Sequence, residues 1–379
     1  MRLSRGARYL VAPDKFKGTL TAAQAAEAIS RGIRQADPTA QITELPFADG
    51  GEGTVEAIIH AGGQRHQQSV SGPLGDPVTA TWVTHQEVAF LELAEASGLR
   101  YVDPDPTSAL NADTYGTGQL ISAALDAGFR RIIVGAGGSA TTDGGFGALR
   151  ALGARFLDSE GQPVDHPGDI EHIAQLRTDG LHPTLTDSMV EVCADVRSPL
   201  LGPQGAAQMF GPQKGADTGA VAQLEARLTH LAKLYATVTP HHEVAAAGGA
   251  AGGFAAGAMA VLGAQLRGGV EVLADLLELR DRIQDTDLVV VGEGSLDAQS
   301  TFGKTPVGIA RIAQSLGVPT IAVVGVTTLT AGALHSQGIQ LITSATEVAP
   351  GLADALARPA HFVELAAKAA ISTCLADLE

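Results

Sequence analysis

The segment Ala12–Thr19, with the sequence APDKFKGT, places an acid, two lysines and a glycine between an apolar stretch and a helical pattern. The apolar stretch, Tyr9–Ala12, is typical of a short buried strand. Thr21 and Gln24 have the spacing of a capping box, and apolar residues then recur at helical spacing from Ala22 to Ile33. The turn between a strand and a helix of an α/β protein is a common phosphate site, because the helix N-terminus offers N–H donors. This segment therefore predicts an α/β fold with a phosphate site.

Both ends of the chain alternate between strand and helix patterns. After the first helix, Gln41–Phe47 is expected to form a strand and Thr54–His60 a helix. Towards the other end, the patterns predict the strands Asp287–Val291, Thr320–Val324 and Ile339–Ile342 and the helices Pro306–Leu316 and His361–Leu375. This alternation is typical of a parallel sheet covered by helices. The two ends could therefore share one sheet.

The middle of the chain follows another pattern. Short strands between Gln67 and Leu93 follow one another with Gly/Pro turns and leave no room for helices, which indicates antiparallel pairing. A helix after Thr114, strands at Arg131–Val134 and Met189–Cys193 and a helix near residues 220–236 come next. A chain of 379 residues exceeds what one core usually serves. We expect residues 1–62 and 286–379 to form one domain, and residues 63–285 a mixed-sheet domain inserted into it.

Composition excludes several classes of protein. The chain has 25 Lys+Arg against 41 Asp+Glu, a net charge of −16, which opposes binding to nucleic acid or anionic lipid. Cys193 and Cys374 are far apart and belong to no metal-binding pattern, so neither a disulfide framework nor a zinc site is indicated. Tyr9–Ala12 is too short for the core of a signal peptide. We expect a cytoplasmic protein without a membrane or nucleic-acid partner.

One stretch, Val244–Leu266, carries no charge and is about long enough to cross a bilayer. Most of its residues are alanine and glycine, which supply little insertion energy. We therefore expect a buried or cleft-lining glycine-rich helix there.

Four stretches that combine glycines with acids or hydroxyl groups each follow an expected strand. Glycine lets backbone N–H groups approach a phosphate, and carboxylates beside such loops usually hold magnesium. One such loop alone is more often a simple turn, with Thr54 for example acting as an N-cap. Four at strand ends favour a ligand cleft. The stretches are Pro13–Gly18, Ala48–Thr54, Gly135–Gly145 and Gly292–Asp297.

Two of the glycine patterns invite nucleotide-site interpretations. Gly135–Ala140 after a strand matches the dinucleotide fingerprint and motivates the alternative of an NAD(P)-dependent dehydrogenase of a small hydroxy acid. Against it, polar residues follow where the helix should begin. Gly303–Thr305 resembles the end of a P-loop, but Ala298 stands where that motif requires a glycine. Lys304 is open to two interpretations, a phosphate ligand or an exposed lysine.

Two further charged residues follow the strand Met189–Cys193. Asp195 comes two residues after the strand, where an acid can serve as a base or simply cap a turn. Lys214 lies in the loop that follows and could equally be a solvated surface lysine.

Several motifs follow one another in order along most of the chain, namely Ala12–Gly18, Asp49–Thr54, Thr114–Gly118, Gly137–Gly145, Asp195–Leu200, Gly211–Ala216, Gly248–Gly253 and Gly292–Lys304. Taken together, these motifs resemble the type-1 glycerate kinases of bacteria. The resemblance implies a flavodoxin-like domain made from both chain ends with a restriction-endonuclease-like insertion, and ATP-dependent phosphorylation of D-glycerate, with 2-phosphoglycerate favoured. Lys15 stands where the family often has Ser, and Thr142 where it usually has Asn.

Phosphoryl transfer requires positioning, a metal ion, cations and a base, and the candidate residues can be assigned to these roles. We expect Lys17 to contact phosphate, assisted by Lys15 or Lys304, and Asp195 to act as the base. The candidates for holding Mg²⁺ are Asp297, Glu293 and Asp14, and the candidates for binding glycerate or phosphate are Asp49, Gly137, Gly138, Ser139 and Thr141.

The sequence also bears on a regulatory function and on oligomer formation. A non-catalytic, ligand-responsive regulator is disfavoured because no basic DNA-binding element is present. The sequence leaves homo-oligomer formation open.

Overall fold

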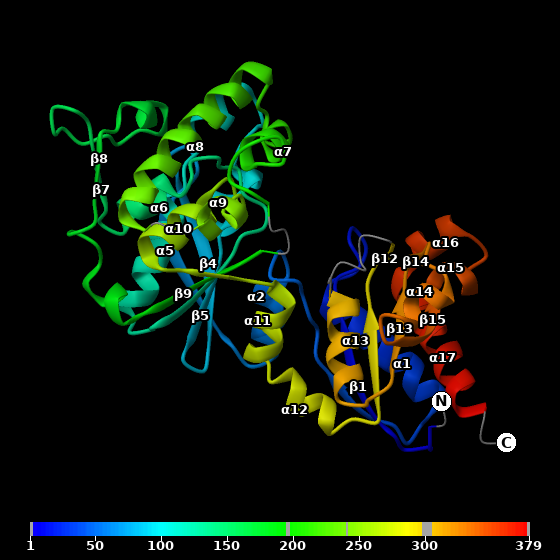
Figure 1. The fold of residues 1–379 in the computed structure, drawn as a ribbon. Coiled ribbons are helices and arrows are strands. Elements are labelled where there is room, and N and C mark those ends of the chain that lie inside the picture. The colour runs from blue at the N-terminus through cyan, green and yellow to red at the C-terminus, as the bar shows by residue number, and fades with distance from the viewer. Residues whose placement is uncertain (1–2, 195–197, 240–241, 298–304, 377–379) are drawn as a thin grey trace. The chain divides into compact units, whose positions relative to one another are not determined.

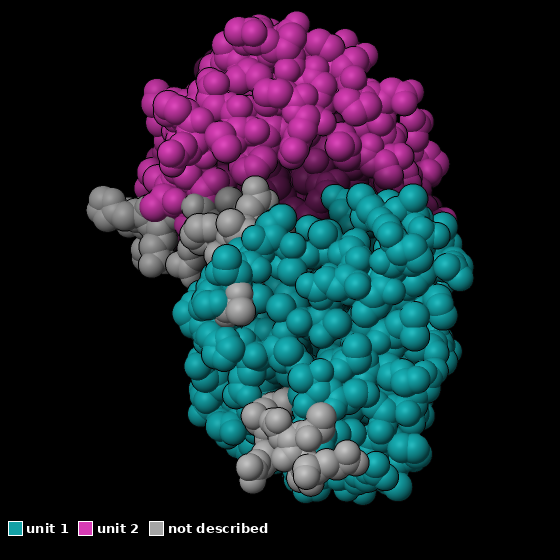
Figure 2. All heavy atoms as spheres, turned by 90° about the vertical axis from the view of Figure 1, so that its right-hand side faces the viewer, with its two compact units in different colours: residues 1–62, 269–379 teal, residues 63–268 magenta. Residues whose placement is uncertain are grey.

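The computed structural model describes residues 3–194, 198–239, 242–297 and 305–376. The chain divides into two compact units, called here unit 1 (Met1–Gly62 with Gly269–Glu379) and unit 2 (Gly63–Gly268), which Figure 2 distinguishes by colour. Each unit has its own α/β sheet. Within the described ranges, no helix combines the length and the apolar character needed to cross a membrane.

Unit 1 is built on a five-stranded parallel sheet in the order β2-β1-β11-β13-β15. Strands from the start of the chain and from its end share this sheet, as the blue and the yellow-to-red segments of Figure 1 show. The expectation of one parallel sheet made from both ends is confirmed, and the order 2-1-3-4-5 is the flavodoxin-like one. The strands are β1 (Arg8–Pro13), β2 (Gln41–Glu44), β11 (Leu288–Gly292), β13 (Thr320–Val324) and β15 (Ile339–Ser344).

The central strand β11 shows why the sheet needs helices on both faces. Its sequence LVVVG is buried at every position, as in a parallel strand that is covered on two sides. At the edge, β2 ends at Glu44, before the expected Phe47. Backbone N–H groups of Leu45 and Phe47 nevertheless donate to carbonyls of Val11 and Pro13, so the chain continues beside β1.

The helices of unit 1 follow the predicted pattern. α1 begins after its N-cap Thr21, which forms the expected capping box with Gln24, and Asp37 is its C-cap. α2 begins at Thr54, but its N-cap is Gly53 in the left-handed region, because the Thr54 hydroxyl donates back to Gly51 O. The helices are α1 (Ala22–Ala36), α2 (Thr54–His60), α11 (Gly269–Leu276), α12 (Leu279–Gln284), α13 (Thr305–Ser315), α14 (Ala331–His335), α15 (Ala345–Val348), α16 (Leu352–Ala357) and α17 (Pro359–Ala376).

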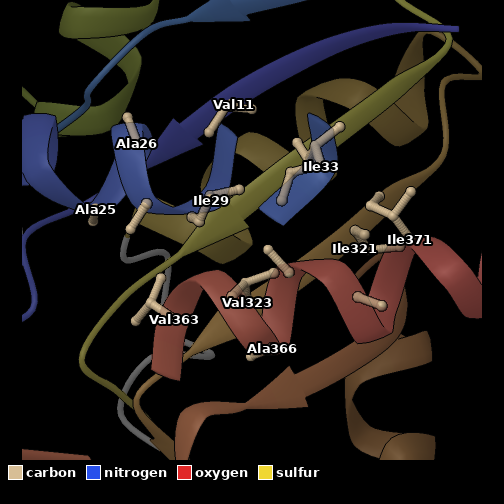
Figure 3. Packing of buried hydrophobic residues seen from close by; sticks show 14 of the residues in the cluster. Val11, Ala25, Ala26, Ile29, Ile33, Ile321, Val323, Val363, Ala366 and Ile371 are labelled. Atoms are coloured by element: carbon tan, nitrogen blue, oxygen red, sulfur yellow. The ribbon is translucent and has the colours of Figure 1, made fainter. Parts of the chain in front are cut away.

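α1 and α17 pack together over one face of this sheet. Figure 3 shows Ile29 and Ile33 of α1 beside Val363 and Ile371 of α17, with side chains of β13 among them. The two helices approach closely at Gly32, where a Cβ atom would lie 2.8 Å from Ala367 Cβ and 2.9 Å from Lys368 N. The helix pair therefore depends on the missing side chain at this position.

We expect Gly32→Ala to lower the free energy of unfolding by about 2 kcal/mol. Overpacking against a rigid neighbour costs about 3 kcal/mol, and the better helix propensity of alanine returns about 1 kcal/mol. The urea midpoint of unfolding measures the difference. Gly332→Ala in α14 is the matched control, because no atom lies within 4 Å of a Cβ placed there. A Gly32→Ala protein as stable as the Gly332→Ala protein would contradict the close approach.

Unit 2 contains a six-stranded mixed sheet in the order β10-β9-β6-β5-β4-β3. β3, β4 and β5 pair antiparallel, as predicted, and β5, β6, β9 and β10 pair parallel. A separate small hairpin-like pair is formed by β7 (Arg155–Leu157) and β8 (Gln175–Arg177). The strands of the main sheet are β3 (Gln64–Ser71), β4 (Pro77–His85), β5 (Val88–Glu92), β6 (Arg131–Gly135), β9 (Met189–Cys193) and β10 (Gln265–Arg267).

Helices cover the sheet of unit 2. The α-helices are α3 (Ala94–Ser97), α4 (Pro106–Asn111), α5 (Tyr115–Asp126), α6 (Phe146–Ala151), α7 (Ala206–Phe210), α8 (Thr218–Val238), α9 (His242–Ala247) and α10 (Phe254–Leu262). Short 3₁₀ turns lie at Leu99–Tyr101, Pro167–His172, Pro183–Asp187 and Pro212–Lys214.

The expectation of one helix over Val244–Leu266 is wrong. The stretch forms α9 and α10, which are separated by glycine-rich turns. The physical reason is a close approach at Gly252, which has φ +66°, because a Cβ there would lie 2.7 Å from Thr142 Cα. Gly144 N donates to Gly252 O at 3.0 Å across this contact. The glycines of this stretch therefore allow two loops to pack closely, and they interrupt the helix.

The second domain boundary also differs from the expected one. Residues 269–285 belong to unit 1, whereas we placed them in the inserted domain. The reason is tertiary packing: α11 and α12 contact α13, and a Cβ at Gly269 would lie 2.7 Å from Gly50 Cα. Local sequence pattern carries no sign of such contacts.

Candidate active site

The carboxyl edge of the unit 1 sheet brings together the loops that follow β1 and β11. The chain leaves β1 towards β2 on one side, while β11 lies on the other side, so the edge between β1 and β11 is a topological switch point. Ligands of open α/β sheets bind at such points. Asp14 directly follows β1 and Glu293 directly follows β11, and Asp14 N donates to Gly292 O at 2.8 Å.

Glycines allow these loops to pack against each other. A Cβ at Gly294 would lie 3.1 Å from both Lys17 N and Phe16 Cα, tighter than most real Cβ contacts. Next to it, Gly325 N donates to Glu293 O at 3.0 Å, and the short parallel strands β12 (Ser295–Leu296) and β14 (Val326–Thr327) continue the contact. Three loops are thereby held in fixed positions around the edge of the sheet.

A pocket of about 440 Å³ opens at this edge. All of its lining residues belong to unit 1. Its polar side contains six of the residues that the sequence singled out, namely Asp14, Lys15, Lys17, Asp49, Glu293 and Asp297, together with Glu52. The structure therefore brings most of the predicted phosphate and metal residues of unit 1 into one pocket.

Asp14 is a buried carboxylate of this pocket with a strongly raised pKa. It is only 9% exposed, and its oxygens accept from Thr305 Oγ1 at 2.7 Å and from Lys15 N at 2.6 Å. Burial, and then the nearby charge of Asp49, raise its pKa to about 6 despite these hydrogen bonds. A cation in the pocket would relieve both effects.

The two lysines of the pocket differ in their surroundings. Lys15 donates to Glu52 O and lies 3.7 Å from the Glu52 carboxylate, so it links the loop after β1 to the loop before α2. Lys17 is exposed and makes no side-chain hydrogen bond or ion pair with the described residues. Lys17 is therefore the lysine that can turn towards an anionic ligand without breaking a contact.

The pocket fits a magnesium ion that is shared with a ligand. Five carboxylates and two lysines line it, which would repel a phosphate chain unless a cation came with it. Among the described residues, no three His, Cys, Asp or Glu side chains stand close enough to hold a metal by themselves. Mg²⁺ commonly uses one or two carboxylates together with phosphate oxygens and water. The roles of Asp14, Glu293 and Asp297 as metal ligands stay a prediction.

In unit 2, the loop after β6 forms a second polar cluster. Gly137 and Gly138 are exposed at its tip, whereas Ser139 and Thr141 are buried. Ser139 Oγ accepts from Thr141 N at 3.1 Å and lies 3.0 Å from Thr141 Oγ1. Thr142 Oγ1 is buried and has no hydrogen-bond partner among the described atoms.

Lys214 supports this loop and is buried, which excludes the interpretation of Lys214 as a solvated surface lysine. It is 3% exposed, and its Nζ donates to Thr141 O at 2.6 Å and to Ser139 Oγ at 3.4 Å. Burial lowers its pKa to about 8, and the charge of Asp143 opposes that change. No carboxylate of the described residues forms an ion pair with it. A buried cation without an ion-pair partner suits a loop that receives an anion.

The comparisons with known proteins agree with this picture. Residues 9–375 match the model of the glycerate kinase family. The chain belongs to the glycerate kinase family. It is 41% identical to glycerate 2-kinase of Escherichia coli (strain K12), over 89% of this chain and 90% of that protein. It is 40% identical to glycerate kinase of Bacillus subtilis (strain 168), over 95% and 96% of the two chains.

A crystal structure from Salmonella typhimurium LT2, provisionally described as glycerate kinase 2, is similar throughout. Its TM-score is 0.87 at 40% sequence identity, over 98% of this chain and 99% of that one. The chain is therefore an enzyme of the glycerate kinase family, with the fold of that structure.

Two predicted residues of this family member, Asp195 and Lys304, lie outside the described residues. Their neighbours are described: Asp195 follows β9, and Lys304 precedes α13. β9 has the predicted bounds, and α13 begins one residue before the expected start. The roles assigned to the two side chains stay predictions.

The segment Thr114–Gly118, which contributed to the family resemblance, has a structural role. Asp143 accepts from Thr114 N at 2.9 Å and from Thr114 Oγ1 at 2.7 Å, and it also accepts from Gly147 N at 3.0 Å. A Cβ at Gly118 would lie 2.8 Å from Ala148 Cα, so this glycine lets α5 approach α6. The segment orients the loop that precedes α6.

The dehydrogenase interpretation of Gly135–Ala140 finds no support in this member of a kinase family. A dinucleotide fingerprint requires a helix that begins within the glycine stretch. Here α6 begins at Phe146, and the residues before it form turns. The polar residues after Ala140 were the signal of this difference in the sequence.

Proposed function

We propose that the protein transfers the γ-phosphoryl group of ATP to the 2-hydroxyl group of D-glycerate, giving 2-phosphoglycerate and ADP. The observation that carries the proposal is the pocket at the β1/β11 edge, where lysines and carboxylates gather in a member of the glycerate kinase family. The choice of the 2-hydroxyl group rests on the similarity to the glycerate 2-kinase of E. coli.

In this proposal, unit 1 holds the nucleotide phosphates. Lys17 contacts the transferred phosphoryl group because its ammonium has no competing partner among the described residues. Lys15, already anchored on Glu52, and Lys304 add positive charge. Asp14, Glu293 and Asp297 would hold Mg²⁺, which when bound neutralises charge on the phosphate oxygens.

The candidates for binding glycerate are considered in each unit by itself, and in unit 2 they lie in the loop after β6. The tip of the loop after β6, at Gly137 and Gly138, exposes its backbone. The buried hydroxyl groups of Ser139 and Thr141 lie directly behind this tip. Backbone N–H groups and hydroxyls of this kind suit a carboxylate or a phosphate. Asp49, whose Oδ1 accepts from Gly51 N at 3.1 Å, is a candidate for the glycerate hydroxyl groups.

The chemical step requires one proton acceptor. A bond forms between the 2-oxygen of glycerate and the γ-phosphorus, the bond from that phosphorus to the β–γ bridging oxygen breaks, and ADP leaves. The hydroxyl proton passes to the carboxylate that we assign to Asp195. Positioning and charge supply most of the catalysis in such a transfer, which agrees with a site made mainly of loops and lysines.

The proposal is tested by incubation with Mg-ATP and D-glycerate, a coupled assay for ADP and ³¹P NMR of the product. We expect ADP only when glycerate is present, and a phosphate signal coupled to the single proton on C2. A signal coupled to the two protons on C3 would overturn the 2-hydroxyl assignment. Folded protein that releases no ADP with glycerate would overturn the proposed substrate.

For Lys214→Met we expect the KM for glycerate to rise about 10-fold, with a smaller change in kcat. Methionine fills the volume but removes the donor that holds Thr141 O and Ser139 Oγ. Because the pKa of Lys214 is about 8, the wild-type KM should rise between pH 7 and pH 9.5, and the variant should lack that rise. Lys233→Met, an exposed position in α8, is the control. A pH profile that is the same in Lys214→Met and wild type would exclude this role.

A further inference from the structure

The pocket of unit 1 has two chemically different halves. The polar half, described above, lies around the loops after β1 and β11. The other half is apolar and is lined by Val326, Leu352, Ala355, Leu356, Pro359 and Val363. None of these side chains can bind a metal ion or a phosphate. The transfer chemistry leaves this half of the pocket unused.

Two leucines of the apolar half are exposed to an unusual degree. Leu352 is 59% exposed and Leu356 is 56% exposed, and both are among the most exposed large hydrophobic residues of the described chain. They are four residues apart on α16, so they lie on one face of that helix. Both line the pocket, so a ligand there would cover them. Covering exposed leucine surface favours binding of an apolar or aromatic group.

The two halves are joined by a fixed strip of backbone. Ser295 pairs with Val326 between the parallel strands β12 and β14, and Val326 N donates to Gly294 O at 3.0 Å. Val326 therefore stands directly beside the loop that carries Glu293 and Asp297. A ligand with a charged end and a flat apolar end could occupy both halves at once.

We propose that the apolar half of this pocket binds the purine nucleoside of the phosphate donor. The proposal rests on the proposed use of ATP and adds the place and orientation of the nucleotide. Charge decides the orientation, because the lysines are in the polar half and the base, which is uncharged, suits the leucines and Pro359. A pocket of about 440 Å³ lies within the range of about 300–1,000 Å³ typical of small-molecule sites.

The test compares two ligands that share phosphates but differ in the nucleoside. Binding of ADP and of pyrophosphate, each with Mg²⁺, is measured by calorimetry on the full chain. The variant is Leu352→Asn with Leu356→Asn, which removes apolar contact without adding charge. Because more than half of each leucine is exposed, the substitutions leave the core intact. Leu74→Asn, at a 48% exposed leucine of unit 2, is the matched control.

We expect the double variant to bind ADP about 10-fold more weakly and pyrophosphate within 2-fold of wild type. Unchanged ADP affinity would overturn the proposal, and so would an equal loss for both ligands or wild-type protein that does not bind ADP. Because these are binding measurements, they are independent of the glycerate assay. A protein that shows the selective ADP loss but does not phosphorylate glycerate would retain this nucleoside site and refute the proposed reaction.

Discussion

Lys17→Met is expected to lower kcat by about 10³, with the melting temperature unchanged. Lys17 is exposed and makes no side-chain hydrogen bond or ion pair with the described residues, so its removal costs the folded state little. It stands in the pocket on the loop after β1, where its ammonium can reach the phosphoryl group that is transferred. Positive groups placed against the charge of a phosphoryl transition state contribute about 10³ or more in rate. Steady-state kinetics with saturating Mg-ATP and glycerate measure the loss.

Two controls separate charge from placement. Lys368→Met replaces an exposed lysine of α17 in the same unit and should leave kcat unchanged. Lys17→Arg keeps the charge but changes its shape and reach, so we expect it to recover part of the rate. A Lys17→Met enzyme with kcat within 3-fold of wild type would remove Lys17 from the transition state and leave Lys15 or Lys304 as the candidate.

The sequence predicted the parts of the fold that depend on local pattern. The continuous apolar strand β11, the capping box of α1 and the strand β9 are each encoded by neighbouring residues, and the structure confirms all three. The family resemblance added the order of the strands, which no local pattern carries. The boundary at residue 268 depends on contacts of α11 and α12 with α13, so the sequence could not locate it.

In the candidate site too, some features follow from local sequence and others depend on tertiary contacts. Strand-end acids and glycines predicted the unit 1 pocket, because parallel strands present their carboxyl ends at one edge. The burial of Lys214 was not predicted, because it depends on a contact between segments that lie far apart in the sequence. A Cβ at Gly215, which has φ +98°, would lie 2.8 Å from Asp105 Cα, so the loop that carries Lys214 packs against the residues before α4. Only the family motif around Lys214 gave a signal.

Asp14→Asn is expected to lower kcat by about 10³ and, at neutral pH, to stabilise the protein. The pKa of Asp14 is about 6 in the folded state, against 3.8 for an unperturbed aspartate. Below pH 3.8 the carboxyl group of Asp14 is protonated in both the folded and the unfolded state, so it does not lower the free energy of unfolding. Between pH 3.8 and 6 only the unfolded state ionises, so folding stability falls as pH rises. Above pH 6 the ionised carboxylate lowers the free energy of unfolding by its full amount, about 3 kcal/mol.

Asparagine carries no charge, so it avoids the loss of stability caused by a buried carboxylate. It has one acceptor oxygen, however, where Asp14 has two. Thr305 Oγ1 and Lys15 N both donate to Asp14, and losing one of these bonds costs about 1 kcal/mol. We therefore expect the variant to be about 2 kcal/mol more stable than wild type at pH 7.5 and about 1 kcal/mol less stable at pH 3.5. Urea unfolding at a series of pH values measures the crossover.

Asp287→Asn is the matched control, because its pH trend has the opposite sign. The hydrogen bonds and charge of Arg8 lower the pKa of Asp287, so its contribution to stability is present at neutral pH and is lost as pH falls. This variant should therefore lose stability relative to wild type as pH rises from 3 to 5. An Asp14→Asn protein with the same trend as Asp287→Asn would show that the pKa of Asp14 is not raised.

A more stable but inactive Asp14→Asn protein would identify what the carboxylate is for. Groups that cost folding free energy are common at functional sites, where a ligand can compensate their charge. In this pocket the compensating group would be the Mg²⁺ that accompanies the nucleotide, so Mg-ADP should raise the melting temperature of wild type and have little effect on the variant. Equal thermal shifts in both proteins would place the metal on Glu293 and Asp297 instead, and would leave the charge of Asp14 to act on the lysines of its own loop.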